Sequence, residues 1–378
     1  MPEIQVYKGN LTSKERVRRA FQFEKADRVP INYFTNPGVN GRLMEHLGLE
    51  KNDYAGLYNR LGVDFRGIGA GYNGPALHVS KREDRTVNSM YGFVHRWIEN
   101  ESGGYWDYCD FPLEFASVED VADWAMPDPD NFNYDSLEAQ INANESYALH
   151  LGGAGLACII NTAGFFRGME QVLVDLITDD EAGLLLIDRF IGQQLATLER
   201  ELAAIDKTAK KQNKKLNELL DFVYMGEDLG TQNTPLISMQ ILKKHILPRQ
   251  KPFFDLCKYY DLPTLLHTCG SSSWAYEEYI CLGLGGVETL QPEAKDMNPE
   301  YLKKTFGGRL AFHGCISTAG PLAYGTAEET AENVRETLEI MMPANAYMLS
   351  PTHQIQDNTP VENIVAMYQT AHEYGRYI

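Results

Sequence analysis

The feature that most restricts the fold of this chain is a regular alternation of short apolar runs and helix-length amphipathic segments. From residue 147 onward, strand-like runs occur at 148–152, 221–225, 264–267, 286–290, 310–314 and 347–350, and two more precede them at 29–34 and 62–68. Each later gap holds a helical pattern, the longest over 181–205. Eight strands alternating with helices predict an α/β protein with a closed (β/α)₈ TIM barrel, and an open doubly wound sheet is the alternative.

Two segments lie outside this alternation. The capping-box pattern Thr12-Ser13-Lys14-Glu15, followed by apolar residues at helical spacing, predicts an N-terminal helix. Residues from about 75 to 145 are interpreted as an insertion over the catalytic face, because aromatic-rich runs at 87–97 and 104–109 flank Ser102 and predict a hairpin, and Ser117 begins a short helix. We therefore expect one domain over 1–378 that carries this insertion.

Composition restricts the partners of the chain. A net charge of −18 predicts repulsion from nucleic acid and from anionic membranes, so a small-molecule substrate is expected. No apolar run approaches the roughly 18 residues that a membrane span needs, and no secretory leader is recognised, so a cytoplasmic location is expected. The six scattered cysteines are expected to be reduced, the basic run at 207–215 is interpreted as a solvated helix end, and a homodimer is compatible with these features.

Residues that follow barrel strands face the active site of such folds. His267 and Cys269 are two positions apart at one strand end, so their side chains can point to the same side and share one ion. One nitrogen and one sulfur ligand suit zinc. A third ligand must come from another strand end, and the candidates are His353, Cys315, Glu227 and His313. The alternative is that His267 only forms a local hydrogen bond and that Cys269 is an ordinary buried thiol.

Other polar and aromatic residues also fall near predicted strand ends. Glu227 and Asp228 are adjacent acids, of which one can serve as a ligand or as a general acid or base, and the alternative for one of them is an N-cap of the next helix. The predicted substrate-binding residues are Tyr33, Asn36, Arg66, Tyr72, Gln232 and Gln356. For the aromatic members of this set, packing in the core is the alternative.

At these same positions the chain resembles the uroporphyrinogen decarboxylase superfamily. The matching segments are LGVD at 61–64, MGEDLGTQ at 225–232, LHTCG at 266–270, SPTH at 350–353 and TPVENI at 359–364. The resemblance implies a (β/α)₈ barrel. It also implies one of two activities, since one branch decarboxylates uroporphyrinogen without a metal and the other comprises zinc methyltransferases that exchange methyl groups with a corrinoid.

The resemblance favours the methyltransferase branch. The decarboxylases carry an arginine-rich segment after the first strand, whereas residues 31–38 contain no arginine here. The methyltransferases hold zinc with H-x-C and a later cysteine. His267 and Cys269 match the first pair, and His353 stands where the later cysteine is expected, a departure that makes the site richer in nitrogen and puts thiol activation in question.

The resemblance therefore implies a zinc-dependent methyltransferase acting between a small substrate, such as a methyl ether or a thiol, and a corrinoid. No D-x-H-x-x-G corrinoid motif occurs, so the corrinoid is expected on a separate protein. Glu227 is expected to fill or guard the fourth zinc position. The alternatives are a decarboxylase in which Asp64 or Asp228 contacts pyrrole nitrogens, and a non-catalytic barrel that binds a ligand or a corrinoid protein.

Overall fold

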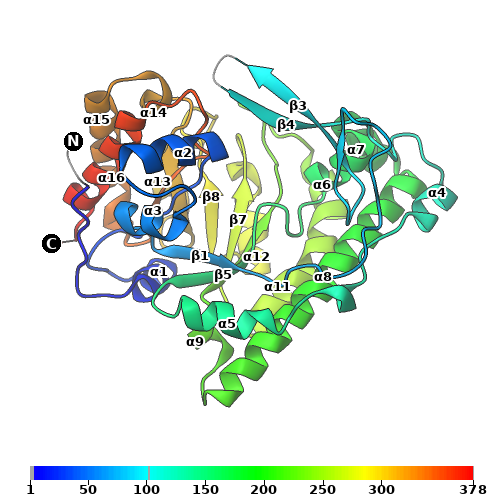
Figure 1. Cartoon of the computed structure of the whole chain (residues 1–378), viewed down its shortest axis with the longest axis horizontal. Helices are drawn as coiled ribbons and strands as arrows, with labels where there is room; N and C mark the ends of the chain where they lie inside the picture. The colour runs from blue at the N-terminus through cyan, green and yellow to red at the C-terminus, as the bar shows by residue number, and fades with distance from the viewer. Residues whose placement is uncertain (1–3, 101–102, 378) are drawn as a thin grey trace.

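Seven parallel strands form one curved sheet in the computed structural model, which describes residues 4–100 and 103–377. Figure 1 shows the strands surrounded by helices. The strands follow one another in chain order as β1 (Phe65–Ile68), β5 (Ala148–Gly152), β6 (Phe222–Gly226), β7 (Thr264–Thr268), β8 (Gly286–Thr289), β9 (Ala311–Ile316) and β10 (Tyr347–Pro351). Strand β1 begins later than predicted, because Gly62 ends the preceding helix in a left-handed conformation.

The remaining gap between β10 and β1 is filled by the first predicted strand, residues 29–34. Its residue Asn32 donates a backbone hydrogen bond to Leu349 of β10 (2.9 Å), and on the other side the Asp64 N–H donates to Ile31 (2.9 Å). Pro30 lacks an N–H and can only accept, from Leu349, which explains why this segment pairs irregularly. With it the sheet closes, so the predicted (β/α)₈ fold class is confirmed.

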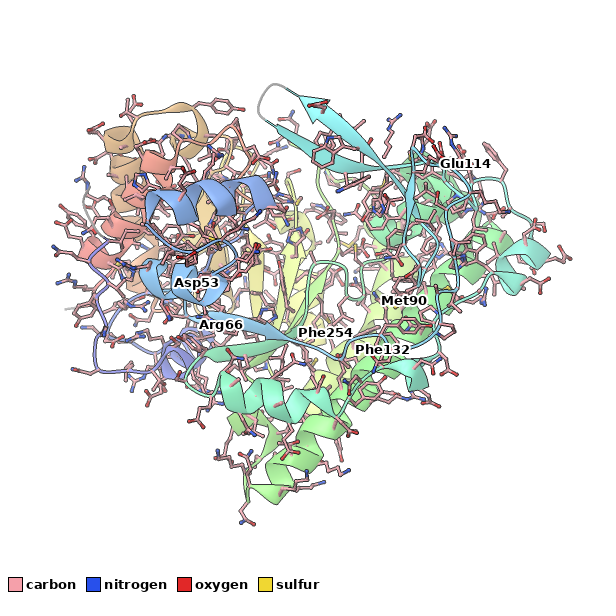
Figure 2. The ribbon with its side chains drawn as sticks, viewed as in Figure 1. Asp53, Arg66, Met90, Glu114, Phe132 and Phe254 are labelled. Atoms are coloured by element: carbon pink, nitrogen blue, oxygen red, sulfur yellow. The ribbon has the colours of Figure 1, made fainter. Side chains whose placement is uncertain are left out.

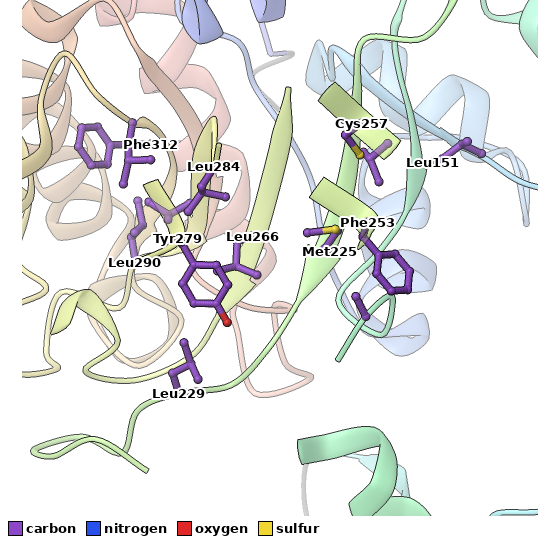
Figure 3. Packing of buried hydrophobic residues seen from close by; sticks show 14 of the residues in the cluster. Leu151, Met225, Leu229, Phe253, Cys257, Leu266, Tyr279, Leu284, Leu290 and Phe312 are labelled. Carbon is purple, nitrogen blue, oxygen red and sulfur yellow. The ribbon is translucent and has the colours of Figure 1, made fainter. Parts of the chain in front are cut away.

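Helices cover the outside of the sheet. Outward-facing strand residues such as Leu151, Met225 and Leu266 pack against helix residues that include Phe253 and Tyr279 (Figure 3). Helix α8 ends at Lys211, within the basic run noted above. The helices are α1 (Ser13–Phe21), α2 (Pro37–His46), α3 (Tyr54–Leu61), α4 (Val118–Asp123), α5 (Ser136–Ala143), α6 (Ile160–Arg167), α7 (Met169–Thr178), α8 (Glu181–Lys211), α9 (Leu216–Leu219), α10 (Met239–Ile241), α11 (Leu247–Tyr259), α12 (Tyr276–Leu282), α13 (Pro299–Phe306), α14 (Pro321–Tyr324), α15 (Ala327–Met341) and α16 (Val361–Tyr374).

The N-terminal helix α1 closes the end of the barrel at which the strands begin. Its capping box between Thr12 and Glu15 forms as predicted, and Val17 and Ala20 pack into the barrel interior with Phe222. Because apolar side chains fill this end of the barrel, the polar residues of the site are expected at the opposite end, at the carboxyl termini of the strands.

A buried ion-pair cluster lies at the same closed end. The carboxylate of Asp64, which directly precedes β1, is fully buried and bonds the guanidinium groups of Arg28 (2.5 Å) and Arg16 (3.2 Å). These cations hold the pKa of Asp64 below its usual value, although burial acts in the opposite direction. This location does not agree with the expectation that Asp64 contacts a pyrrole in a decarboxylase. Both of its oxygens bond arginines at the amino-terminal end of the barrel, whereas the site lies at the carboxyl-terminal ends of the strands.

The segment between β1 and β5 contains a three-stranded antiparallel sheet made of β2 (Thr86–Val87), β3 (Val94–Asn100) and β4 (Gly103–Cys109). Strands β3 and β4 form the predicted hairpin, with Trp97 opposite Trp106, while Ser102 lies outside the described residues. The Tyr108 ring stacks on Phe165 of α6 at 3.6 Å. Since α6 follows β5, the hairpin base lies on the side where the strands end, and in Figure 1 the hairpin extends from α6 and α7 toward the side of α2. That the insertion covers the whole site, within a single domain, stays a prediction.

The base of the insertion is fastened by a buried ion pair. Arg167, at the end of α6, bonds Asp175 of α7 at 2.7 Å and donates to the Leu113 carbonyl at 3.0 Å, and both charged side chains are almost fully buried. A buried guanidinium needs such partners to offset its lost hydration. Through these contacts Arg167 attaches the insertion to α6 and α7.

Candidate metal centre

Three predicted ligands come together at the carboxyl-terminal ends of two strands. His267 is in β7, Cys269 follows it, and His353 follows β10, and one ligand atom from each lies within 4.8 Å of the other two. The Cys269 Sγ atom is 3.4 Å from His267 Nε2, and the two imidazole centroids are 6.2 Å apart. This is a cluster of two nitrogen donors and one sulfur donor.

The loops after β6 and β7 fix the position of Cys269. Gly270 has φ +68°, and a Cβ there would lie only 2.3 Å from the Gly230 carbonyl oxygen. Two glycines are thus needed where these backbones touch, and the contact is completed by the Ser271 N–H, which donates to Thr231 at 2.7 Å. The loops at 226–231 and 267–270 therefore fix each other's backbone, and this contact positions the Cys269 thiol.

Asp228 is the acid that belongs to this cluster. Its Oδ1 atom accepts the Cys269 backbone N–H at 2.8 Å and lies 3.8 Å from His267 Nε2, while its Oδ2 accepts from Asn161 at 2.6 Å. Because two donors already orient it, this carboxylate is held beside the three ligands rather than pointing into solvent.

Glu227 points away from the cluster. Its buried carboxylate accepts the backbone N–H groups of Ile159 (2.8 Å) and Ile160 (3.0 Å) at the start of α6, and Gln250 donates to it at 3.3 Å. Burial raises the pKa of Glu227 to about 8. Glu227 therefore lies at the N-terminus of α6, which precedes it in the chain, and not beside the fourth metal position. The predicted alternative, an N-cap of the next helix, is not its role, because Ser238 caps that helix.

A carboxylate within the barrel orients His267. Glu288 of β8 is paired with His267 in the sheet register, and its Oε2 atom is 2.5 Å from His267 Nδ1. The Tyr224 hydroxyl of β6 donates to the same oxygen at 2.9 Å. Burial favours the neutral imidazole, but the Glu288 charge outweighs it and raises the pKa of His267 well above its usual value.

The environment of Cys269 and His353 favours their neutral forms. Burial raises the pKa of the Cys269 thiol, although His267 partly opposes this change. Desolvation lowers the pKa of His353, and the neighbouring His267 lowers it further. A metal ion would therefore have to displace protons from Cys269 and from His267 Nε2, which is ordinary for sites with thiol and imidazole ligands.

The donor set fits zinc. Tetrahedral coordination with Zn–S near 2.3 Å and Zn–N near 2.0 Å separates a nitrogen and a sulfur ligand by about 3.5 Å. The His267 Nε2 to Cys269 Sγ distance of 3.4 Å matches this value. Three protein ligands leave one position open, which is the pattern of catalytic zinc sites.

The structure does not bring two other candidate ligands into the cluster. His313 lies deeper in the barrel, where its Nε2 atom is 3.1 Å from Asn32 Nδ2, and burial lowers its pKa to about 4. Cys315 is fully buried and follows Gly314, and both residues have positive φ, which interrupts the alternation of the strand. Of the four candidates for the third ligand, His353 alone is in the cluster.

Some of the predicted substrate-binding residues lie at the rim of the barrel. Asn36 donates to the Gln356 side chain at 3.0 Å, and a parallel bridge between Thr35 and Ile355 holds these two strand ends together. Gln232 is exposed on the loop after β6. These three amides remain candidates for binding a polar substrate.

The other predicted substrate-binding residues are engaged elsewhere. Tyr33 is buried between the rings of Tyr58 and Tyr368, so it packs in the core. Arg66 lies over the Tyr147 ring at 3.8 Å, and Tyr72 packs on Phe132 at 5.2 Å. Figure 2 marks Arg66 on β1 and Phe132 among the side chains of the chain.

Apart from His313, the polar residues inside the barrel were not predicted from the sequence. Glu288, Tyr224, His313 and His150 all point into the barrel, where large aliphatic residues are usual. A search restricted to residues after strand ends could not find them. The available signal was an acid at the third position of the buried G-V-E-T run.

Comparisons with known proteins show what this chain is similar to. The model of the uroporphyrinogen decarboxylase (URO-D) family matches residues 221–374, a range that contains His267, Cys269 and His353. A methylcobamide:CoM methyltransferase, MtbA, from Methanosarcina acetivorans is 27% identical over 147 residues, which are 38% of this chain and 40% of that protein. A methyltransferase from Methanosarcina mazei has the same fold, with a TM-score of 0.60 and 16% identity over 97% of this chain and 99% of its own.

The predicted resemblance to the uroporphyrinogen decarboxylase superfamily is thereby confirmed, and within that superfamily the similarities lie with methyltransferases. The matched part of MtbA is less than half of that protein. Among the described residues, no helix combines the length and apolar character needed to cross a membrane.

Proposed function

We propose that the protein is a zinc-dependent methyltransferase that moves a methyl group between a small substrate and a corrinoid carried by a separate protein. The observation that carries this proposal is the cluster of His267, Cys269 and His353 at the carboxyl-terminal strand ends, with donor atoms within 4.8 Å. The similarity to MtbA supports methyl transfer and a corrinoid partner. A methyl ether, a thiol or a comparable small molecule is the proposed substrate.

The residues divide into holding and orienting groups. His267 Nε2, Cys269 Sγ and His353 would hold zinc, which when bound supplies a Lewis acid and stabilises a thiolate. Asp228 fixes the backbone of Cys269, and its Oδ1 atom lies 3.8 Å from His267 Nε2, where it could accept or return a proton. Asn36, Gln232 and Gln356 at the rim would contact polar groups of the substrate.

The second histidine affects which substrates suit the site. A thiolate ligand donates more charge to zinc than an imidazole does, so two imidazoles and one thiolate leave the ion more electrophilic than one imidazole and two thiolates would. That difference favours polarising an ether or similar oxygen over activating a thiol. The direction of transfer follows from the substrate that proves active.

The test is a methyl-transfer assay in both directions. Zinc-loaded protein is mixed with methylcobalamin and a set of thiols, and separately with reduced cobalamin and methyl ethers or methyl thioethers, while the absorbance of the corrinoid is followed. We expect zinc-dependent turnover with one substrate class, lost in Cys269→Ala. If zinc binds and neither free cobalamin nor a methylated corrinoid protein reacts with any of them, a non-catalytic barrel replaces this proposal.

A further inference from the structure

The polar residues inside the barrel are connected to the proposed metal ligands through one atom, His267 Nδ1. Glu288 Oε2 lies 2.5 Å from this nitrogen, and its side chain is almost fully buried. The Tyr224 hydroxyl donates to the same carboxylate oxygen at 2.9 Å and is 3.3 Å from His267 Nδ1. Three strands, β6, β7 and β8, thus each contribute one member of a hydrogen-bonded group.

We infer that Glu288 and Tyr224 are positioning residues that hold His267 with its Nε2 atom toward Cys269 and His353. This inference rests on the proposed function, because it treats Nε2 as a zinc ligand. A carboxylate that accepts from Nδ1–H fixes both the tautomer and the rotation of the ring. The other ring nitrogen is then left as the ligand atom, 3.4 Å from the thiol.

The sheet register explains why the arrangement is rigid. His267 and Glu288 are lateral neighbours on adjacent parallel strands, so their side chains leave the sheet at the same height and on the same side. Glu288 is held in turn by Tyr224, and its other oxygen faces His313 Nδ1 at 3.9 Å, beyond hydrogen-bond distance. The carboxylate therefore has two short contacts, one to the ligand histidine and one to the tyrosine, and a longer hydrogen bond from the Thr289 hydroxyl at 3.4 Å.

The energetic argument concerns the cost of burying a charge. Burying a carboxylate is unfavourable unless hydrogen-bond donors surround it, and an apolar residue at that position in a barrel interior would avoid this cost. Glu288 meets this need through its contacts with His267 Nδ1 at 2.5 Å and with the Tyr224 hydroxyl at 2.9 Å. Packing alone would not require a carboxylate at this position.

The experiment compares zinc affinity in Glu288→Gln, Tyr224→Phe and a control, Asp175→Asn. The control removes the charge of another almost fully buried acid, which pairs with Arg167 away from the cluster. Affinity is measured by competition with a chromophoric chelator, and folding is checked by circular dichroism. We expect the affinity to fall about 10- to 100-fold in Glu288→Gln, to fall less in Tyr224→Phe, and to be unchanged in Asp175→Asn.

A second readout separates this inference from the proposed function. Nitrogen NMR of the histidine rings in metal-free protein reports the protonation and hydrogen bonding of both ring nitrogens of His267, and Glu288→Gln is expected to change the Nδ1 signal. Zinc binding by folded Glu288→Gln with wild-type affinity would overturn the inference while leaving the methyltransferase proposal intact. If wild-type protein binds no zinc, the proposed function fails, and an unchanged His267 signal in Glu288→Gln would then refute the positioning role as well.

Discussion

The backbone N–H of Cys269 donates a hydrogen bond of 2.8 Å to Asp228 Oδ1, so the acid after β6 directly holds the thiol after β7. The same carboxylate is 3.8 Å from His267 Nε2. One side chain thus contacts the loop of one proposed ligand and lies beside another, which makes Asp228 a sensitive position for testing the site.

The first prediction concerns metal content. Protein purified without chelator is expected to contain about one zinc per chain, as an open catalytic site requires. Cys269→Ser and His353→Ala are expected to lose most of it, because each removes one of three ligands. Elemental analysis measures this, with Cys281→Ser as the matched control, since Cys281 is an exposed thiol on α12. Full zinc occupancy in Cys269→Ser would remove that residue from the site.

The second prediction concerns Asp228. Asp228→Asn keeps the size of the side chain but removes its charge beside Cys269 and His267. We expect kcat/KM for methyl transfer to fall about 10- to 100-fold while zinc remains bound, because the residue supports the ligands without being one. Steady-state kinetics and metal analysis are run on the same preparations. Loss of zinc together with activity would instead make Asp228 the fourth ligand.

Much of the site could be predicted from the sequence, for a physical reason. Parallel strands place their carboxyl ends at one edge, so residues such as Cys269 and His353, 84 positions apart in the printed sequence, meet there whatever the lengths of the helices between them. The barrel itself followed from apolar periodicity, which depends only on local spacing.

What could not be predicted depends on the direction of single side chains. Glu227 and Asp228 are consecutive, so they point to opposite sides, and the sequence does not show which of them faces the helix α6. Glu288 lies within a strand, and its partner His267 is defined by a register between strands that no local pattern encodes.

The third prediction concerns stability in acid. His372 is fully buried, its Nε2–H donates to the Leu61 carbonyl at 2.9 Å, and burial lowers its pKa to about 4. The unfolded chain binds this proton near pH 6.5, so the native state loses stability as the pH falls from about 6.5 to about 4, by up to about 3 kcal/mol from this residue.

His372→Gln tests this, because the amide can still donate to Leu61 but does not titrate. Its free energy of unfolding is expected to depend less on pH than that of the wild type within this window, although it is lower at pH 7 from imperfect packing. Urea unfolding between pH 4.5 and 7.5 measures both quantities. The same pH dependence in both proteins would show that His372 does not contribute to acid sensitivity.

The last prediction is that the protein does not decarboxylate uroporphyrinogen. The resemblance implies that this substrate carries eight carboxylates, and each must keep water or gain a cation on binding, because an unpaired buried carboxylate costs several kcal/mol. Arg66 and Arg167 are already engaged, Arg66 with the carbonyls of Val63 and Phe65 and Arg167 with Asp175. A chain with a net charge of −18 and no arginine in residues 31–38 provides no positive potential to offset the charges of this substrate.

In the test, protein is incubated with uroporphyrinogen and the formation of coproporphyrinogen is followed by chromatography, with an active decarboxylase as the positive control. Turnover on the order of 1 per second, an ordinary enzymatic rate, would overturn the proposed methyltransferase function and restore the decarboxylase alternative.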